Sequence, residues 1–429
     1  MSIYQYEQAF GAADKTTAQM RKAIQRWFAM YYEATVKETA DPCQRIPYTV
    51  VNKLVRAVFG EYTATANTPF GQKALESLNG QKRQAMQLAL VGGACYIKPC
   101  PGKTGFSFTL VPRDQVLIFG RDPDGNPRDV GLVERCAQGN DYYTLLERRQ
   151  VDENGYLTIT NRLFRSRDSR NLGGEVPLKN VPAYKDLAES YCFQKPVGSV
   201  GLAEMKLPML NCVDGSCDGV SVYAAAEGLI RNIDQNEAQM SGEFSRGESR
   251  IIASRDLLDG QLGLQDHLFV GLDEDPEQVG ITVFSPKLRE ESYLARKQEY
   301  LRNVESLLGL KRGMLSDANM EDRTATEIES SAAEYSLTVM DFQNLWQETV
   351  EKALGLCRIL AELYHFPEKD PGQLRFDWGN GNFYDQEKIW ADYMEMVEKG
   401  ILKPEVALAW RFGLAGEDES AIREKYMPG

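Results

Sequence analysis

Two long helical patterns on either side of a short insert constrain the fold of this chain more than any other feature. The first pattern spans residues 220–246, and the second spans residues 285–309, where Gly309 is a natural helix stop. After a break, a third and longer helical pattern begins at residue 324. This order predicts a stalk with a loop at one end, which suits a structural conduit better than a catalyst.

The insert between the first two helices, residues 247–284, is acidic and strand-like. Arg250–Ala253 and Gly280–Phe284 are predicted as strands. Residues 248–284 contain eight Asp and Glu against two Lys and Arg, which gives a local charge of −6. We therefore expect a small, negatively charged α/β element between the helices.

Local signals set the ends and faces of these helices. The first pattern turns polar from Asp234 onward, as a helix does when it leaves a core for solvent or an interface. Ser285 and Pro286 form a cap followed by a first-turn proline. The third pattern opens with a capping box at residues 324–327, repeats its apolar residues about every 3.5 positions and ends at Pro367. Unbroken, this helix would be about 60 Å long.

The first 219 residues predict a mixture of helices and antiparallel strands. Amphipathic helices are expected at residues 14–34, 48–62 and 70–90. The strands that follow are joined by turns too short for helical crossovers, so we expect a mostly antiparallel sheet. The predicted strands are residues 94–99, 106–112, 116–119, 130–137, 142–149 and 157–164. Residues 166–219 are rich in turns, and the C-terminal residues predict two or three short helices, so the fold class is α+β.

The charge of the chain limits its partners. The formal net charge is −13 and the pI is near 5.0. A tight, general nucleic-acid binder needs clustered Lys and Arg to displace counterions, so that class is not expected. An acidic protein can still contact DNA where the DNA has to slide. No run of 18 apolar residues occurs, so we expect no membrane span, and residues 1–5 show no secretory signal.

Neither a metal site nor a catalytic centre is predicted. Cys95/Cys100 and Cys212/Cys217 are each separated by four residues, whereas zinc sites prefer shorter spacings within a pair and usually recruit His. From the redox-compartment rule we expect the eight cysteines to be reduced and mostly buried. The chain has two histidines and contains neither a G-x-S-x-G nor a P-loop motif. We expect no enzyme and no cofactor, although an Asp/Glu cluster for metal-dependent nuclease chemistry stays open.

Lys311 and Arg312 lie in the break between two long helices and allow two interpretations. They could be cations that complement the dipole at a helix C-terminus. Alternatively, they could belong to a loop that faces DNA phosphates.

Several segments, taken in order, resemble one known family. They are Arg45–Val55, Gly92–Pro99, Phe108–Asp114, Tyr142–Glu147, Ile159–Phe164, Gly219–Ala226, Glu243–Ile251 and Arg323–Ile328. In this order the chain resembles the portal protein of tailed bacteriophages, of the kind found in phages and prophages of Gram-positive bacteria. The resemblance extends over nearly the whole chain.

The resemblance implies a portal fold divided into seven segments. These are a wing (1–219), a first stem helix (220–246), a clip (247–284), a second stem helix (285–309), a tunnel loop (310–323), a long helix with a return to the wing (324–382) and a short helical crown (383–429). The C-terminal segment is short for the family, so a large crown is not expected.

The same resemblance implies a function and a set of partners. Portal proteins form a ring, usually of twelve subunits, at one capsid vertex of the virion, and they are assembled in the host cytoplasm. Double-stranded DNA passes through the ring during packaging and ejection. The terminase large subunit docks first and a head–tail adaptor later, while major capsid and scaffold proteins surround the ring.

Candidate contact residues follow from position in the family. The tunnel loop would present Lys311, Arg312, Met314, Asn319 and Arg323 to DNA. The clip would present Arg250, Ile252, Arg255, Asp273, Glu274 and Asp275 to terminase and adaptor.

Two other classes compete with the portal interpretation. Another ring-forming or minor capsid protein would lack the two-helix stalk. A nucleic-acid enzyme would need a carboxylate cluster that binds Mg²⁺.

Overall fold

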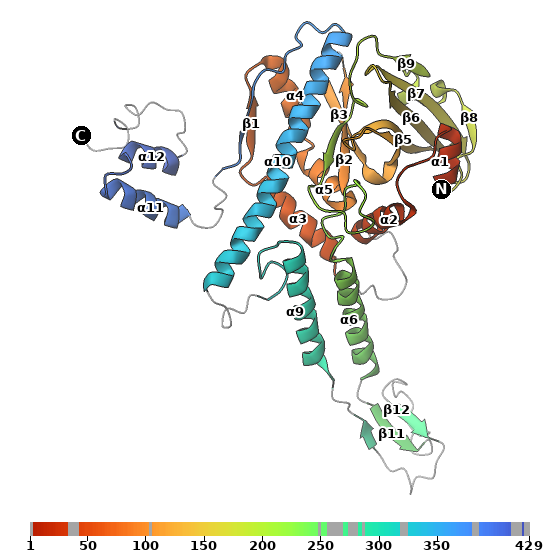
Figure 1. The fold of residues 1–429 in the computed structure, drawn as a ribbon. Coiled ribbons are helices and arrows are strands. Elements are labelled where there is room, and N and C mark those ends of the chain that lie inside the picture. Colours follow the sequence, from red (N-terminus) through yellow and green to blue (C-terminus); the bar gives the residue numbers. More distant parts are fainter. Residues whose placement is uncertain are drawn as a thin grey trace. The chain divides into compact units, whose positions relative to one another are not determined.

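The protein is a mixed structure of helices and sheets, as predicted (Figure 1). It divides into two compact units, Met1–Phe376 and Asp377–Gly429. The computed structural model describes residues 3–32, 43–102, 105–247, 250–254, 269–272, 282–284, 288–317, 325–379, 386–412 and 423.

Five helices open the first unit: α1 (Ile3–Phe10), α2 (Ala18–Tyr32), α3 (Ile46–Val58), α4 (Pro69–Asn79) and α5 (Lys82–Gly92). The helices predicted at residues 14–34 and 48–62 correspond to α2 and α3, and α1 has no predicted counterpart. The single helix predicted over residues 70–90 is wrong. Gly80 and Gln81 separate α4 from α5, because Gln81 has non-helical backbone angles of φ −109° and ψ 3°.

A three-stranded antiparallel sheet in the order β10-β2-β3 follows α5. It consists of β2 (Ala94–Pro101), β3 (Phe106–Pro112) and β10 (Ala203–Lys206). Gly93, with φ 84°, makes the turn from α5 into β2, and a Cβ on it would lie 2.2 Å from the carbonyl oxygen of Gly219. The absence of a Cβ at both glycines lets the chain that leads into α6 pass directly against the start of β2.

A second antiparallel sheet has the order β4-β5-β6-β7-β8, with β9 paired to β7. Its strands are β4 (Val116–Arg121), β5 (Pro127–Gln138), β6 (Asp141–Val151), β7 (Leu157–Ser166), β8 (Gly174–Val176) and β9 (Ser190–Cys192). Phe10 of α1 packs on one face with Phe119 and Leu146, while Leu178 and Tyr184 pack on the other. The predicted strands and their antiparallel pairing are confirmed.

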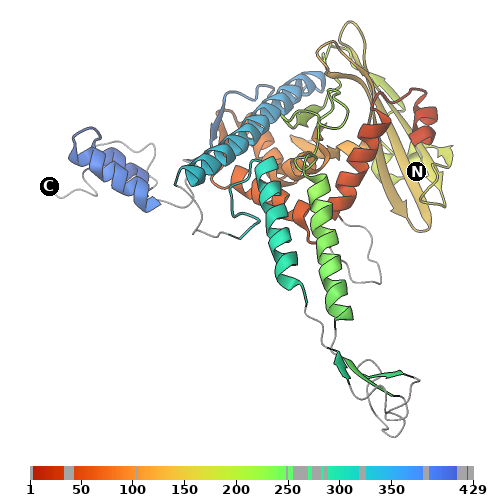
Figure 2. The same ribbon diagram turned by 60° about the horizontal axis from the view of Figure 1, so that its bottom comes forward.

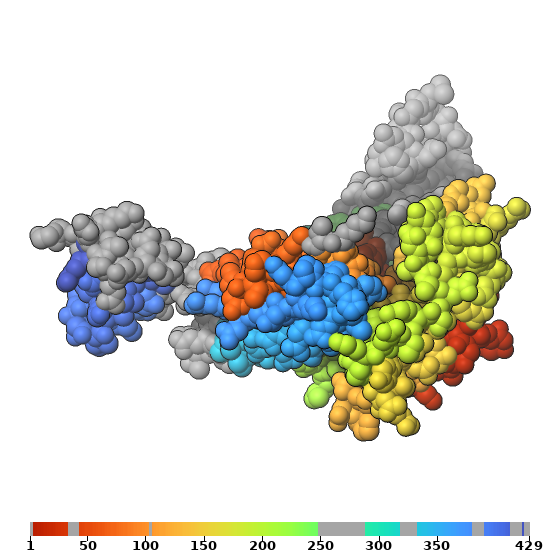
Figure 3. All heavy atoms as spheres, turned by 90° about the horizontal axis from the view of Figure 1, so that it is seen from above, coloured from red at the N-terminus to blue at the C-terminus, as the bar shows by residue number. Residues whose placement is uncertain are grey.

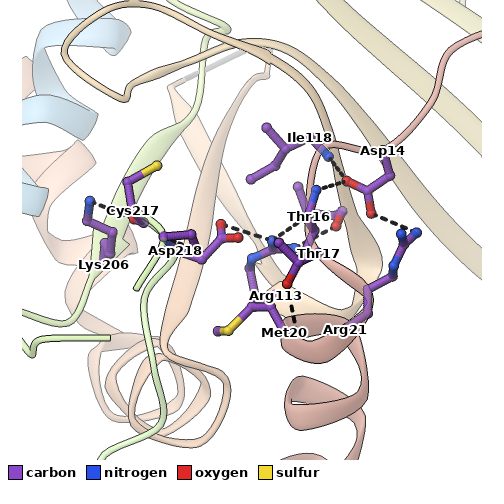
Figure 4. Close-up of polar contacts among 12 residues, drawn as sticks. Asp14, Thr16, Thr17, Met20, Arg21, Arg113, Ile118, Lys206, Cys217 and Asp218 are labelled. Carbon is purple, nitrogen blue, oxygen red and sulfur yellow. Dashed lines mark hydrogen bonds and ion pairs between the residues drawn. The ribbon is translucent and has the colours of Figure 1, made fainter. Parts of the chain in front are cut away.

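Arg113, between β3 and β4, connects three parts of the first unit (Figure 4). Its side chain is 3% exposed and donates to Thr16 Oγ1 at 2.8 Å, to Val116 O at 2.8 Å and to Asp218 Oδ1 at 3.3 Å. Arg121 also donates to Asp218, at 2.6 Å. A buried charge needs such partners, so this cluster fixes the residues before α6 to the N-terminal helices.

A second buried cluster joins the two larger sheets of this unit. Glu147 of β6 accepts from Lys98 of β2 at 3.0 Å and from Arg149 at 2.5 Å, and Arg149 also donates to the carbonyl oxygens of Val200 and Gly201. Burial alone would raise the pKa of Glu147, but the charges of Arg149 and Lys98 outweigh it and lower that pKa to about 2. The carboxylate is therefore ionised at neutral pH.

Helices α6 (Glu227–Arg246) and α9 (Glu290–Leu307) lie side by side and antiparallel (Figure 2). Both begin later than predicted. Residues 220–226 are mostly buried and form no helix, and residues 222–226 make a turn. Val222 N and Ser221 Oγ donate to Leu90 O at 2.9 and 3.0 Å, which fixes this segment against α5. The second helix begins at Glu290 and not at Ser285, which lies outside the described residues.

Helix α10 (Ala325–Leu363) has 39 residues, so the long third helix is confirmed. Trp346 and Val350 are fully buried, and Trp346 meets Phe59 at the end of α3 edge-to-face. Figure 3 shows the blue half of α10 beside the orange segment that contains α4. Thr324, the first residue of the predicted capping box, lies outside the described residues.

Two small sheets complete the first unit. In one, β11 (Arg250–Ser254) pairs in parallel with β12 (Phe269–Leu272) and antiparallel with β13 (Thr282–Phe284). β11 and β13 confirm the two predicted strands, while β12 was not expected. In the other, β1 (Thr63–Ala66) pairs with β14 (Leu374–Asp377).

The described part of the second unit contains α11 (Gln386–Glu398) and α12 (Pro404–Phe412). These agree with the short helices predicted there. The rings of Tyr393 and Trp410 lie 5.1 Å apart edge-to-face, and the Arg411 guanidinium lies over Trp390. Aromatic contacts therefore hold the two helices together.

Candidate functional site

The contact between α6 and α9 is polar over most of its length. Ile230 and Ile233 of α6 are buried, but the next buried residue is Asn236, which is 1% exposed. Asn236 Nδ2 donates to Tyr293 O at 3.1 Å, and Asn236 Oδ1 accepts from Arg296 Nε at 2.7 Å. Because both ends of the amide are used, the register of the two helices is fixed by hydrogen bonds.

Two ion pairs lie near this amide, one between α6 and α9 and one between α6 and Arg289, the N-cap of α9. Glu243 pairs with Arg289 at 2.9 Å, and hydrogen bonds from Arg289 and then Tyr293 lower the pKa of Glu243 to about 2. Lys297 pairs with Glu237 at 3.1 Å and donates to Gln44 Oε1 at 2.8 Å. The predicted change of α6 from apolar to polar is thus confirmed, and its polar half faces α9.

The small sheet of β11–β13 is inserted between α6 and α9 in the chain. It contains two of the predicted clip residues, Arg250 and Ile252, both on the central strand β11. Arg250 pairs with Phe284, and Ile252 pairs with Thr282 and Val270. The remaining predicted clip residues, Arg255, Asp273, Glu274 and Asp275, lie outside the described residues.

The loop that follows α9 is folded tightly at its base. Gly309 has φ 59°, as expected for a helix stop, and its carbonyl oxygen lies 3.4 Å from Thr338 Oγ1 of α10. Leu310 is only 4% exposed. The loop therefore starts from a fixed point between two helices.

Glu305, in the last turn of α9, organises the rest of this loop. Its side chain is fully buried and accepts four hydrogen bonds from the loop. The donors are Gly313 N at 3.2 Å, Leu315 N at 2.5 Å, Ser316 N at 2.8 Å and Ser316 Oγ at 2.8 Å. Backbone N–H groups that converge on one carboxylate give the loop a defined shape.

Three of the predicted tunnel-loop residues lie in this segment. Lys311 and Arg312 are exposed and Met314 is half-buried. Asn319 and Arg323 lie outside the described residues. Helix α9 has no basic residue in its last turn, and both cations follow its C-cap Leu308 by three or four positions. A helix dipole acts within the last turn, so the dipole interpretation of Lys311 and Arg312 is weakened.

Several residues that shape this region are absent from the sequence prediction: Asn236, Arg296, Glu305 and Ser316. One signal was present. Glu305 follows Leu301 and Val304 in an apolar stripe and lies four positions before the helix stop Gly309. A charged residue in such a position needs local partners. Asn236 carries no comparable signal, because its partners come from another helix.

No disulfide joins any of the eight cysteines. Only Cys95 and Cys357 are buried, so the expectation that most are buried is wrong. Burial raises the pKa of the Cys95 thiol to about 12. In the described part of the chain, no three His, Cys, Asp or Glu side chains gather as a metal site. Among the same residues, no helix is long and apolar enough to span a bilayer.

Comparison with known proteins gives one clear result. The family model described as phage portal protein, SPP1 Gp6-like, matches residues 136–425. The match includes most of the second sheet, α6, α9, α10 and both C-terminal helices. No curated protein matches the chain significantly.

Proposed function

Because the chain belongs to the family of SPP1 Gp6-like phage portal proteins, we propose that its copies close into a ring at one capsid vertex and form a conduit for double-stranded DNA. The proposed ring has about twelve subunits, as is usual in the family. DNA passes through it during packaging and again during ejection.

The observation that carries this proposal is the order of α6, the β11–β13 sheet, α9 and the loop before α10. An antiparallel helix pair with a small sheet inserted between its helices supports a stem and a clip, and the loop supports a tunnel loop. The proposed segments are the wing (1–219), the stem helices (220–246 and 285–309), the clip (247–284), the tunnel loop (310–323), the long helix with its return to the wing (324–382) and the crown (383–429).

The charge of the chain supports a channel in which DNA slides. A net charge of −13 per subunit repels phosphates, so the duplex is not trapped while a motor moves it. Lys311 and Arg312, on the loop with the fixed base, steady the duplex without gripping it. Met314 and the more distant loop residues Asn319 and Arg323 belong to the same proposed surface.

The proposed clip is the docking site for protein partners. The terminase large subunit binds it during packaging, and a head–tail adaptor replaces terminase afterwards. Arg250, Ile252, Arg255, Asp273, Glu274 and Asp275 are the proposed contact residues. Major capsid and scaffold proteins are the proposed partners around the ring, and the virion is its final location.

The first experiment measures the mass and shape of the purified protein by mass photometry and negative-stain electron microscopy. We expect a ring with a central hole and a mass near twelve times 48.3 kDa. If the protein is a monomer or dimer, the measurement is repeated after co-expression with scaffold and major capsid protein. A protein that forms no ring under either condition contradicts the proposal.

A further inference from the structure

Both ends of the Lys311–Arg312 pair are held by one residue. The backbone oxygen of Glu305 accepts from Leu310 N at 2.9 Å, immediately before the pair. The carboxylate of Glu305 accepts from Gly313 N at 3.2 Å, immediately after it. A turn bond from Met314 N to Lys311 O, 3.1 Å long, closes the segment between these two contacts.

Burial of the Glu305 carboxylate would destabilise the fold unless hydrogen bonds replaced its lost hydration. Leu301 and Val304 of α9 and its C-cap residue Leu308 are buried, and Glu305 itself is 0% exposed. Burying a charged group without hydrogen bonds is strongly unfavourable. The four donors described above satisfy the carboxylate, and all of them come from the loop, so the loop and the buried charge stabilise each other.

We propose that Glu305 is a positioning residue that fixes the backbone of the loop from Gly309 to Asp317 and thereby presents Lys311 and Arg312 from a rigid support. A further hydrogen bond joins the end of the loop to α9, because Asp317 N donates to Gln298 Oε1 at 2.8 Å. This inference rests on the proposed conduit function, because the presentation of two cations matters only if phosphates pass them. A cation on a rigid loop contacts a phosphate with a smaller loss of conformational entropy than one on a mobile loop.

Amide hydrogen exchange of the full-length protein tests the structural half of this proposal. In Glu305→Gln, which keeps the side-chain volume, the peptide containing Gly313, Leu315 and Ser316 should exchange roughly tenfold faster or more. Ser316→Ala removes one of the four donors and should give a smaller acceleration. Glu299→Gln is the control: it removes an exposed carboxylate of α9 that pairs with Arg302. In this variant the amides of residues 313–316 should exchange at the wild-type rate. Unchanged exchange in Glu305→Gln overturns the proposal.

Particles assembled with the same variants test the functional half. If Glu305 positions the basic pair for DNA, Glu305→Gln should change packaged genome length or DNA retention, in the same direction as the double substitution Lys311→Glu and Arg312→Glu. Suppose that Glu305→Gln forms a normal ring and its loop exchanges faster, but packaged genome length and DNA retention match the wild type. That result would show that Glu305 does not position Lys311 and Arg312 for DNA. Failure of the wild-type protein to form a ring would instead reject the proposed function itself, so the two failures are distinguishable.

Discussion

Single buried carboxylates hold distant parts of this chain together, and Glu147 shows how such a residue responds to pH. Its folded pKa of about 2 lies below the ordinary value of 4.5. The ionised form therefore stabilises the fold fully above about pH 4.5, and this stabilisation is lost as the pH falls toward 2. The difference between the two values corresponds to stabilisation of the order of 3 kcal/mol.

We expect Glu147→Gln to lower the free energy of unfolding by about 3 kcal/mol at pH 7, because it leaves Lys98 and Arg149 without their carboxylate. The difference from the wild type should shrink between pH 4.5 and 2. Denaturant unfolding at pH 7, 4 and 3 checks this. Glu175→Gln, at an exposed pair with Arg162, should change stability by less than about 1 kcal/mol. A difference between Glu147→Gln and the wild type that does not depend on pH would contradict the explanation.

Reversal of the charges of Lys311 and Arg312 should affect DNA packaging or retention and leave folding intact. We expect the double substitution Lys311→Glu and Arg312→Glu to alter packaged genome length or DNA retention, because two exposed cations become repulsive toward phosphate. Ring mass should stay unchanged, and the free energy of unfolding should change by less than about 1 kcal/mol, because contacts of exposed charges contribute little to stability. Wild-type genome length and retention would rule out a DNA contact at this loop.

Sequence reasoning placed Lys311 and Arg312 in a loop because helix stops are local signals: Gly309 ends one helix regardless of the rest of the fold. It could not assign Asn236 to Arg296 or Glu147 to Lys98. Those pairs join residues that are far apart in the chain, and a single side chain does not reveal which distant group will satisfy it.

Among the helices and strands, the α6–α9 pair depends on hydrogen bonds where most helix pairs depend on apolar packing. We expect Asn236→Ala to destabilise this pair by about 1–3 kcal/mol, because the Tyr293 carbonyl and Arg296 guanidinium lose their buried partner. Hydrogen exchange of α9 peptides measures the effect as faster exchange. Gln235→Ala, at the exposed neighbouring position on α6, is the matched control. Equal exchange rates in the two variants would show that Asn236 does not hold the helices together.

The existence and order of helices and strands were largely predictable, and their first residues were not. The β-region was predicted well because strand alternation and short turns are both local. The start of α6 was misplaced because the apolar residues Val220, Val222 and Ala226 continue a helical pattern. Ser221 Oγ and Val222 N nevertheless donate hydrogen bonds to Leu90 O. A contact from another helix overrides the local preference there.

For the whole molecule, net charge should govern assembly. Each copy carries a net charge of −13, so copies brought together in the proposed ring repel one another at low salt. The screening length falls to about 10 Å at 0.1 M salt, and we therefore expect the fraction of protein in rings to rise between about 0.02 and 0.3 M NaCl. Mass photometry at constant protein concentration measures that fraction. A decrease with salt would show that ion pairs between subunits outweigh the repulsion.

The pairing of β1 with β14 has a consequence for synthesis of the chain. The ribosome completes β1 at Ala66, but its partner strand ends at Asp377, and α10, which buries Trp346 beside α3, also emerges late. Until then the nascent N-terminal helices lack the surface that covers them, and they are open to chaperones or to wrong pairings. Acquisition of the first unit's native fold is therefore tied to translation through β14, so products truncated before that strand should lack the native first unit.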